Sequence, residues 1–165
     1  MKEIECKDGD IMIFAGGKTV VRALEKDIPN ANITRNPAVL IQSRGVIDAV
    51  YYEEAFTFKN EMWAYTHENK TTVKYLYYIM KNNMDFLRKS ASGMGSLPQI
   101  SLPVTEEFII MLPTEKEQER VVSILDRFEK LCNDISVGLP AEIEARQKQY
   151  EYYRDKLLSF ELSSN

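Results

Sequence analysis

The sequence predicts an α+β fold, in which a small mixed α/β domain is followed by C-terminal helices that pair in a coiled-coil-like manner. Three observations predict this class. Short apolar runs bounded by glycine, asparagine, proline or charge alternate with loops through the first two thirds of the 165 residues, as strands do. One amphipathic helix lies within that part, and a nearly continuous helical pattern fills the last third. We therefore expect a folded domain over residues 1–113, a helical region over 114–160 and a short tail over 161–165.

Short strands and one helix are expected in the first domain. The helix covers Thr72–Arg88, because apolar residues from Val73 to Leu87 recur there at helical spacing on one side. The expected strands are the apolar or aromatic runs Ile11–Phe14, Ala38–Gln42, Ile47–Tyr52, Met62–Thr66, Ile100–Leu102 and Phe108–Met111.

The helical region begins at Thr114-Glu115-Lys116-Glu117, which has the pattern of a capping box. Gly138 suits the end of this first helix, and Pro140 suits the first turn of a second. Apolar residues in both helices follow the alternating three and four spacing of a seam between helices. The predicted helix-pairing residues are Val121, Ile124, Phe128, Leu131, Ile135, Ile143, Tyr150, Tyr153, Leu157 and Phe160.

Two interpretations of this apolar stripe stay open. Most amphipathic helices fold back on their own domain. A C-terminal helix behind a glycine-proline break, with aromatics and charge on opposite faces, is also well placed to project and to join a partner.

Composition and charge bound the function. Apolar residues make up 44% of the chain and aromatics 10%, which is enough to build a core. No apolar run reaches about 18 residues and the N-terminus lacks a signal-peptide pattern, so a cytoplasmic protein without a membrane partner is expected. Cys6 and Cys132 are expected to be reduced thiols. The net charge is -4, yet residues 69–104 hold five lysines or arginines and one aspartate, which permits phosphate contacts.

Two loops combine glycine, hydroxyls and positive charge, one around Lys18 and one from Lys89 to Gln99. Between them, Gln42-Ser43-Arg44-Gly45 ends a strand and turns into the next. Glycine lets backbone amides approach a phosphate, while arginine and glutamine can read base edges. Surface turns are also rich in glycine and serine for conformational reasons alone. Arg44 is the best candidate for bidentate guanine recognition. The candidate DNA-binding residues are Lys18, Arg22, Gln42, Ser43, Arg44, Lys89, Ser92, Met94 and Gln99.

Familiar catalytic motifs fail on inspection. Gly17-Lys18-Thr19 resembles the end of a P-loop, but Met12 stands where that motif needs its first glycine. Gly93-Met94-Gly95 is followed by Pro98, where a dinucleotide-binding helix would begin. His67 is the only histidine and lies in a strand end and turn, and the two cysteines offer no metal-binding spacing. We expect no catalytic residue, no metal and no cofactor on this chain.

Four stretches carry a resemblance to a known family: residues 112–126, residues 138–158, residues 37–45 with the aromatic run that follows them to Trp63, and residues 92–101. The first two closely resemble the conserved helical region of DNA-specificity subunits of type I restriction-modification systems. The other two are similar to the second half of a target-recognition domain in such subunits. With one recognition domain and one helical region, the chain resembles a half subunit whose domain 1–113 is expected to be shortened at its N-terminus.

The resemblance implies a function. Such a subunit reads one half of a bipartite target in double-stranded DNA and directs methyltransferase and restriction subunits, which supply the chemistry. S-adenosylmethionine is then expected on the partner methyltransferase subunit. Two copies joined through the C-terminal helices would imitate a whole subunit, so a homodimer is expected.

Two other classes of function compete with this one. The late start of the recognition domain also fits a truncated assembly or decoy module, which would bind partner subunits through its helices without reading DNA. An independent nuclease is disfavoured, because the sequence offers no plausible catalytic site.

Overall fold

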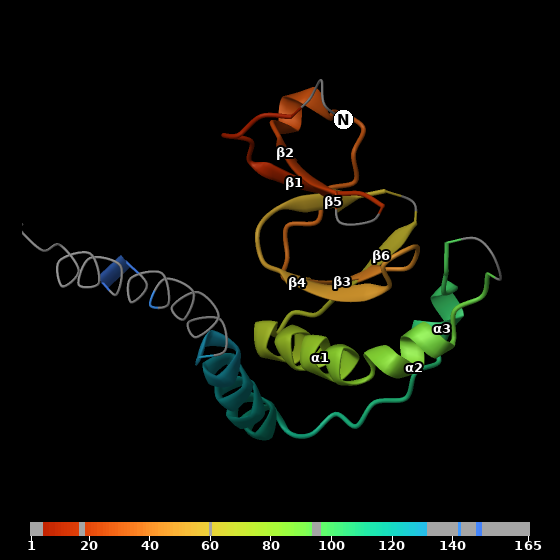
Figure 1. Ribbon diagram of the computed structural model, residues 1–165, viewed down its shortest axis with the longest axis vertical. Helices are drawn as coiled ribbons and strands as arrows, with labels where there is room; N and C mark the ends of the chain where they lie inside the picture. The colour runs from red at the N-terminus through yellow and green to blue at the C-terminus, as the bar shows by residue number, and fades with distance from the viewer. Residues whose placement is uncertain are drawn as a thin grey trace, which may run out of the picture. The chain divides into compact units, whose positions relative to one another are not determined.

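The computed structural model describes residues 5–16, 19–59, 61–93, 97–131, 142, 148 and 149. The chain divides into two compact units, Met1–Val122 and Ser123–Asn165. The strands and the three short helices that carry labels in Figure 1 belong to the first unit.

Within the described ranges, the first unit contains two three-stranded sheets. The first sheet has the order β2-β1-β5 and consists of β1 (Ile11–Phe14), β2 (Val20–Ala23) and β5 (Phe56–Phe58). The second has the order β4-β3-β6 and consists of β3 (Ala38–Gln42), β4 (Asp48–Tyr52) and β6 (Met62–Thr66). β5 runs parallel to β1, and every other pairing is antiparallel.

The strand predictions are confirmed in the centre of the domain and wrong at its C-terminal side. β1, β3 and β6 have the predicted bounds, and β4 begins one residue later than predicted. The predicted strand Ile100–Leu102 is wrong, because Leu102–Glu106 forms the helix α3 with Pro103 in its first turn, a position that proline favours. The predicted strand Phe108–Met111 is also wrong: these residues have no regular structure.

The helix predicted over Thr72–Arg88 is two helices, α1 (Lys70–Asn82) and α2 (Met84–Lys89). Asn69 caps α1 by accepting a hydrogen bond from the Thr71 amide at 2.8 Å. Asn83 separates the helices, and its side-chain amide donates to the Ile79 carbonyl at 2.8 Å. An asparagine side chain that bonds to the backbone carbonyl of the residue four positions earlier competes with continued helix.

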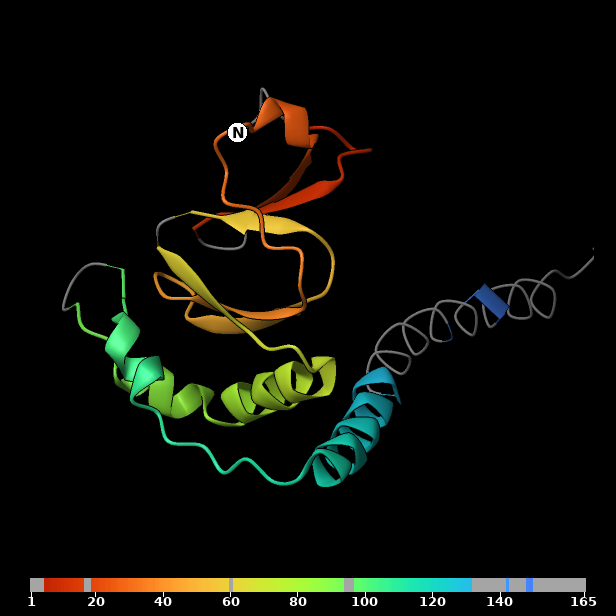
Figure 2. The same cartoon turned by 180° about the vertical axis from the view of Figure 1, so that it is seen from behind.

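The core lies on both faces of β3, all five residues of which are buried. Val39 and Ile41 pack in a cluster with residues of α1 and α2, whereas Ala38 and Leu40 pack in a cluster with Phe56 and the first sheet. The second sheet, with β3 as its central strand, is therefore the middle layer of three. The first sheet packs on one of its faces, and α1 and α2 pack on the other (Figure 1, Figure 2). Burial on both faces explains the continuous apolar sequence of β3.

Residues 115–131 are helical, as the sequence predicts. The amides of Glu117 and Gln118 both donate to the Thr114 carbonyl at 2.9 Å. The Glu117 carboxylate accepts hydrogen bonds from Arg120 Nε at 3.0 Å. It does not accept from the Thr114 amide, as the predicted capping box would require. A guanidinium one turn along the helix is a charge-assisted donor and competes well for a carboxylate.

The first turns of this helix pack within the first unit. Gln118 is buried, its side-chain oxygen accepts from Thr72 Oγ1 at 2.8 Å and its amide donates to the Pro113 carbonyl at 2.8 Å. Val122 is buried as well. A buried glutamine with both polar ends bonded fixes the start of the helix against α1.

The predicted pairing residues of the described helix are largely exposed. Ile124, Phe128 and Leu131 keep 39%, 62% and 51% of their surface accessible in this chain, and Val121 is half-buried. The predicted helix break lies outside the described residues. So do the predicted pairing residues Ile135, Ile143, Tyr150, Tyr153, Leu157 and Phe160.

None of the helices in the described ranges combines the length and the hydropathy needed to span a bilayer. Cys6 is a free thiol, and Cys132 lies outside the described residues.

Candidate nucleic-acid interface

The end of β3 and the turn that follows it carry three of the predicted DNA-binding residues, Gln42, Ser43 and Arg44. Gln42 and Ser43 are buried. The Ser43 hydroxyl donates to the Glu61 carbonyl, and the Ser43 carbonyl accepts from the Ile100 amide at 2.9 Å. Both side chains therefore lie beneath the surface, and the hydrogen bonds of Ser43 hold the turn in place. Arg44, in contrast, has 47% of its side chain exposed.

Residues 92–99 join this turn through backbone hydrogen bonds. Arg44 and Gln99 form an isolated antiparallel bridge, and so do Ser92 and Gln99. The Gly45 amide donates to the Pro98 carbonyl at 2.8 Å. Gly45 has a φ of +76°, which glycine adopts without strain. One small ladder therefore contains Arg44, Ser92 and Gln99. It joins parts of the chain that lie nearly fifty residues apart in the sequence.

An open pocket of about 440 Å³ lies beside this ladder. Its lining comes from the β1–β2, β3–β4 and β5–β6 connections and from the 92–99 segment, and consists of Gly16, Arg44, Gly45, Val46, Glu61 and Leu97. The structure thus brings the two loops and the strand-end turn singled out in the sequence to one place. Lys18 and Met94, two of the predicted DNA-binding residues, lie outside the described residues.

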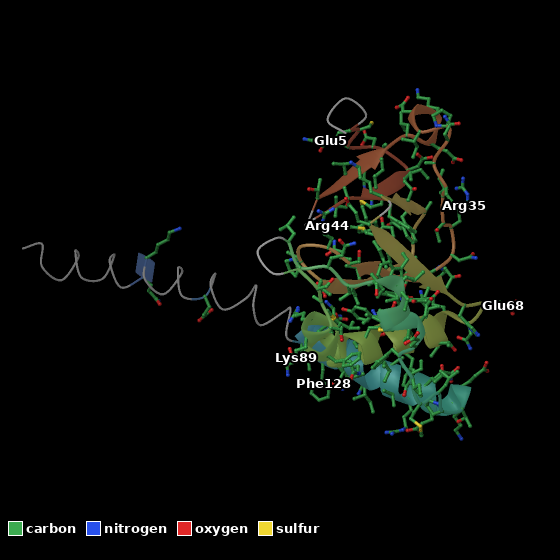
Figure 3. The ribbon with its side chains drawn as sticks, turned by 90° about the vertical axis from the view of Figure 1, so that its right-hand side faces the viewer. Glu5, Arg35, Arg44, Glu68, Lys89 and Phe128 are labelled. Atoms are coloured by element: carbon green, nitrogen blue, oxygen red, sulfur yellow. The ribbon has the colours of Figure 1, made fainter. Side chains whose placement is uncertain are left out.

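Arg44 and Lys89 lie on the same side of the first unit, and Arg35 and Glu68 lie on the opposite side (Figure 3). Lys89 is the last residue of α2 and is exposed. Two of the predicted positive charges therefore mark one face, which also carries the pocket.

Arg22 is placed elsewhere. It lies on β2, where its guanidinium bonds to Glu54 Oε2 at 2.8 Å and to the Gly9 carbonyl at 3.3 Å. The Arg22 hydrogen bond, followed by one from Tyr52, lowers the pKa of the Glu54 carboxyl. Burial, followed by the Glu54 contact, raises the pKa of the Tyr52 hydroxyl. This arginine is thus part of an ion pair at the first sheet and lies outside the group around Arg44.

The positive charge of residues 69–104 is partly used within the fold. Lys70 bonds to Glu53 at 2.5 Å, Lys81 bonds to Asp48 at 2.6 Å, and Lys74 lies 4.4 Å from the centre of the Tyr51 ring. The Lys70 hydrogen bond lowers the pKa of the Glu53 carboxyl. Three of the five basic residues therefore contact β4 or the residue after it, and the basic segment does not form one continuous open patch.

Sequence reasoning missed Glu61, which faces Arg44 across the pocket with 3.8 Å between Oε1 and Nη1. It follows a polar turn between two aromatic strands, and nothing in that turn indicates a partner. Thr105 was also missed, although its hydroxyl joins Trp63 and Tyr65. Within the described residues, no group of three or more histidine, cysteine, aspartate or glutamate side chains is arranged to hold a metal ion.

The fold and this site define a class: a small mixed α/β domain that gathers an arginine-bearing turn and a glycine- and serine-rich segment, and that continues into a helix with exposed apolar residues. Residues 2–145 match the family described as the type I restriction modification DNA specificity domain. The chain belongs to that family.

Two curated relatives and one solved structure agree with this assignment. The chain is 34% identical to the specificity subunit of the type I restriction enzyme EcoR124I/EcoR124II of Escherichia coli, over 87% of this chain and 39% of that protein. It is 34% identical to the putative type I restriction enzyme specificity subunit S.HindORF215P of Haemophilus influenzae, over 93% of this chain and 33% of that protein. The crystal structure of a type I restriction-modification S subunit from M. genitalium shares the fold, with a TM-score of 0.59 at 18% identity over 95% of this chain and 40% of that one. The chain thus spans well under half the length of these relatives.

Proposed function

We propose that this chain is a DNA-specificity module of a type I restriction-modification system. It reads one half of a bipartite target in double-stranded DNA and directs methyltransferase and restriction subunits to that target. The chain itself carries out no catalysis and holds no cofactor, and S-adenosylmethionine is bound by the methyltransferase subunit. Such a complex works in the cytoplasm, where the cell's DNA lies.

The single observation that carries this proposal is the convergence of the Arg44 turn and the 92–99 segment in a chain of the DNA-specificity family. An exposed guanidinium can donate two parallel hydrogen bonds to guanine O6 and N7 in the major groove. Lys89 on the same side is a candidate phosphate contact, which fixes the register of the protein on the duplex (Figure 3).

Replacing Arg44 with alanine is expected to reduce discrimination between the selected target and a scrambled duplex by about 1–3 kcal/mol, because one bidentate base contact is lost. The target is first selected from a library of random duplexes by the full chain together with a type I methyltransferase subunit. Affinities of the wild type and Arg44→Ala for both duplexes are then measured by fluorescence anisotropy at one fixed salt concentration.

Arg35→Ala is the matched control. Arg35 is an exposed arginine on the opposite side of the unit and bonds to Glu25 at 2.7 Å (Figure 3). The Arg35→Ala variant should discriminate between the target and the scrambled duplex as well as the wild type does. Equal losses in the two variants would contradict the assignment of Arg44. If the wild type bound the methyltransferase subunit but enriched no sequence, an assembly module would replace a DNA reader as the function.

We further propose that two copies pair through their C-terminal helices. Ile124, Phe128 and Leu131 are exposed and spaced by four and three residues, which is the repeat of a helix-helix seam. Pairing would remove this apolar surface from water. A two-fold dimer would present two identical recognition domains and would therefore select a symmetric bipartite target.

Replacing Phe128 with aspartate is expected to shift the chain toward the monomer, because a carboxylate is then placed in the apolar seam. Sedimentation equilibrium over a range of protein concentrations measures the shift. Lys130→Asp is the control, since it makes a larger charge change at an exposed position away from the seam. A wild-type chain that stays monomeric at the highest concentration would refute the pairing.

A further inference from the structure

Glu61 and Arg44 form an open ion pair at the end of two neighbouring strands. Arg44 Nη1 and Glu61 Oε1 are 3.8 Å apart, and the two side chains are 47% and 42% exposed. This distance is longer than a hydrogen bond. An exposed pair of this kind contributes little to stability, so both groups remain able to bond to a ligand.

The sheet fixes the position of this pair. β3 and β6 are antiparallel, with Gln42 opposite Met62. The next residues along each strand are Ser43 and Glu61, and the Ser43 hydroxyl donates to the Glu61 carbonyl. Arg44 and Glu61 therefore extend from the ends of paired strands, which hold a reading group more firmly than a free loop does.

The carboxylate makes this a poor site for a phosphate. A phosphate that approached the Arg44 guanidinium would also approach Glu61, and the two negative charges would repel each other. A base edge in the major groove has no such conflict. Guanine O6 and N7 accept hydrogen bonds from arginine, and the N4 amino group of cytosine donates to a carboxylate.

The rest of the pocket suits the flat, partly apolar edge of a base. Val46 and Leu97 line it and are 42% and 61% exposed. A donor, an acceptor and apolar side chains thus surround one open volume of about 440 Å³. These are the kinds of group that direct readout of a base pair uses.

We propose that Glu61 is a specificity-determining residue. It accepts a hydrogen bond from the N4 amino group of a cytosine in the base pair next to the one whose guanine Arg44 reads. This inference rests on the proposed DNA-reading function and adds to it the identity of a base contact. Glu61 has a second effect: its negative charge weakens binding to DNA in which no cytosine amino group faces it.

Glu61→Gln tests both effects, since glutamine keeps the size of the side chain and removes its charge. A glutamine amide can bond to adenine N6 and N7 as well as to cytosine N4. The variant is therefore expected to lose about tenfold of its preference for cytosine at one position of the target, with adenine gaining there. Its affinity for a scrambled duplex is expected to rise a few-fold, because a repulsive charge has gone.

Glu68→Gln is the matched control. Glu68 is exposed on the opposite side of the first unit, and its substitution makes the same change in net charge (Figure 3). The wild type and both variants, each as the full chain with the methyltransferase subunit, select duplexes from the same random library. Anisotropy then gives their affinities for single-position variants of the wild-type target.

Two results would overturn the inference while leaving the proposed function intact. One is a wild type that selects a sequence and a Glu61→Gln variant with the same base preferences. The other is an Arg44→Ala variant whose plot of log affinity against log salt loses about one unit of slope, which is the signature of a lost phosphate contact. A wild type that selects no sequence would instead refute the proposed function itself.

Discussion

Replacing Thr105 with valine is expected to lower the free energy of unfolding by about 2–4 kcal/mol, because two polar groups lose a buried partner at once. Thr105 is 4% exposed. Its hydroxyl accepts from Trp63 Nε1 at 2.9 Å, lies 2.7 Å from the Tyr65 hydroxyl and donates to the Leu102 carbonyl at 3.1 Å. One donated and two accepted bonds use the full capacity of a hydroxyl, and valine of nearly the same shape replaces none of them.

Urea unfolding measures this loss, and Trp63 is the single tryptophan, so its fluorescence reports the site directly. Thr105→Ser keeps the hydroxyl and should restore most of the stability. Thr57→Val is the matched control, since the Thr57 hydroxyl is also buried but makes one bond, to the Asn32 carbonyl at 2.8 Å. If Thr105→Val lowered the free energy of unfolding no more than Thr57→Val, the three hydrogen bonds of the Thr105 hydroxyl would not stabilise the domain as we expect.

The hydrogen bonds of Thr105 also support the candidate interface. Trp63 and Tyr65 lie on β6, and Thr105 lies on α3. α3 directly follows the segment in which Gln99 pairs with Arg44. Loss of the Thr105 bonds should therefore release the chain on the C-terminal side of that segment as well as destabilise the domain.

The strands that could be predicted are those whose own residues determine them. β3 is buried on both faces, so its apolar run stands out in the sequence. β2 and β5 do not stand out in this way: β2 has Arg22 among its four residues and only Ala23 is buried, and β5 has only three residues. Such strands form because neighbouring strands supply partners for their backbone groups, and that information is not local.

Local rules also explain the errors in helices. Leu102-Pro103 reads as the end of an apolar strand, but proline in that place favours the first turn of a helix. The periodicity of Thr72–Arg88 continues across Asn83, and the side-chain bond that separates α1 from α2 interrupts it.

For the candidate site, residue type predicted one half of the pair. Arg44 could be singled out because an exposed arginine beside glycine at a strand end is a recognisable candidate. Glu61 could not, since its relation to Arg44 arises from the pairing of β3 with β6 across some twenty residues of sequence. The sequence likewise does not show that Lys70, Lys74 and Lys81 contact side chains at β4.

Replacing Gly9 with alanine is expected to destabilise the first unit by about 2–3 kcal/mol, because the added methyl group overlaps the backbone of β2. An ideal Cβ on Gly9 would lie 2.5 Å from the Ala23 nitrogen and 2.6 Å from its carbonyl carbon and oxygen. Ala23 is fully buried and pairs with Ile11 of β1, so this backbone cannot move aside without breaking the sheet. Alanine also restricts the unfolded chain, which favours folding by about 0.4–1 kcal/mol and offsets only part of the clash.

Gly16→Ala separates the clash from that effect on the unfolded chain, because both variants share the restriction that alanine imposes. A Cβ on Gly16 would meet only Glu61 Oε2, at 3.2 Å. Since this atom is the far end of a partly exposed side chain, it can turn away, and the free energy of unfolding should stay within about 0.5 kcal/mol of the wild type. Urea unfolding of the two variants side by side decides the matter. Equal stability would mean that Gly9 does not need its close approach to β2, whereas a loss confined to Gly9→Ala shows that the approach holds the first sheet together.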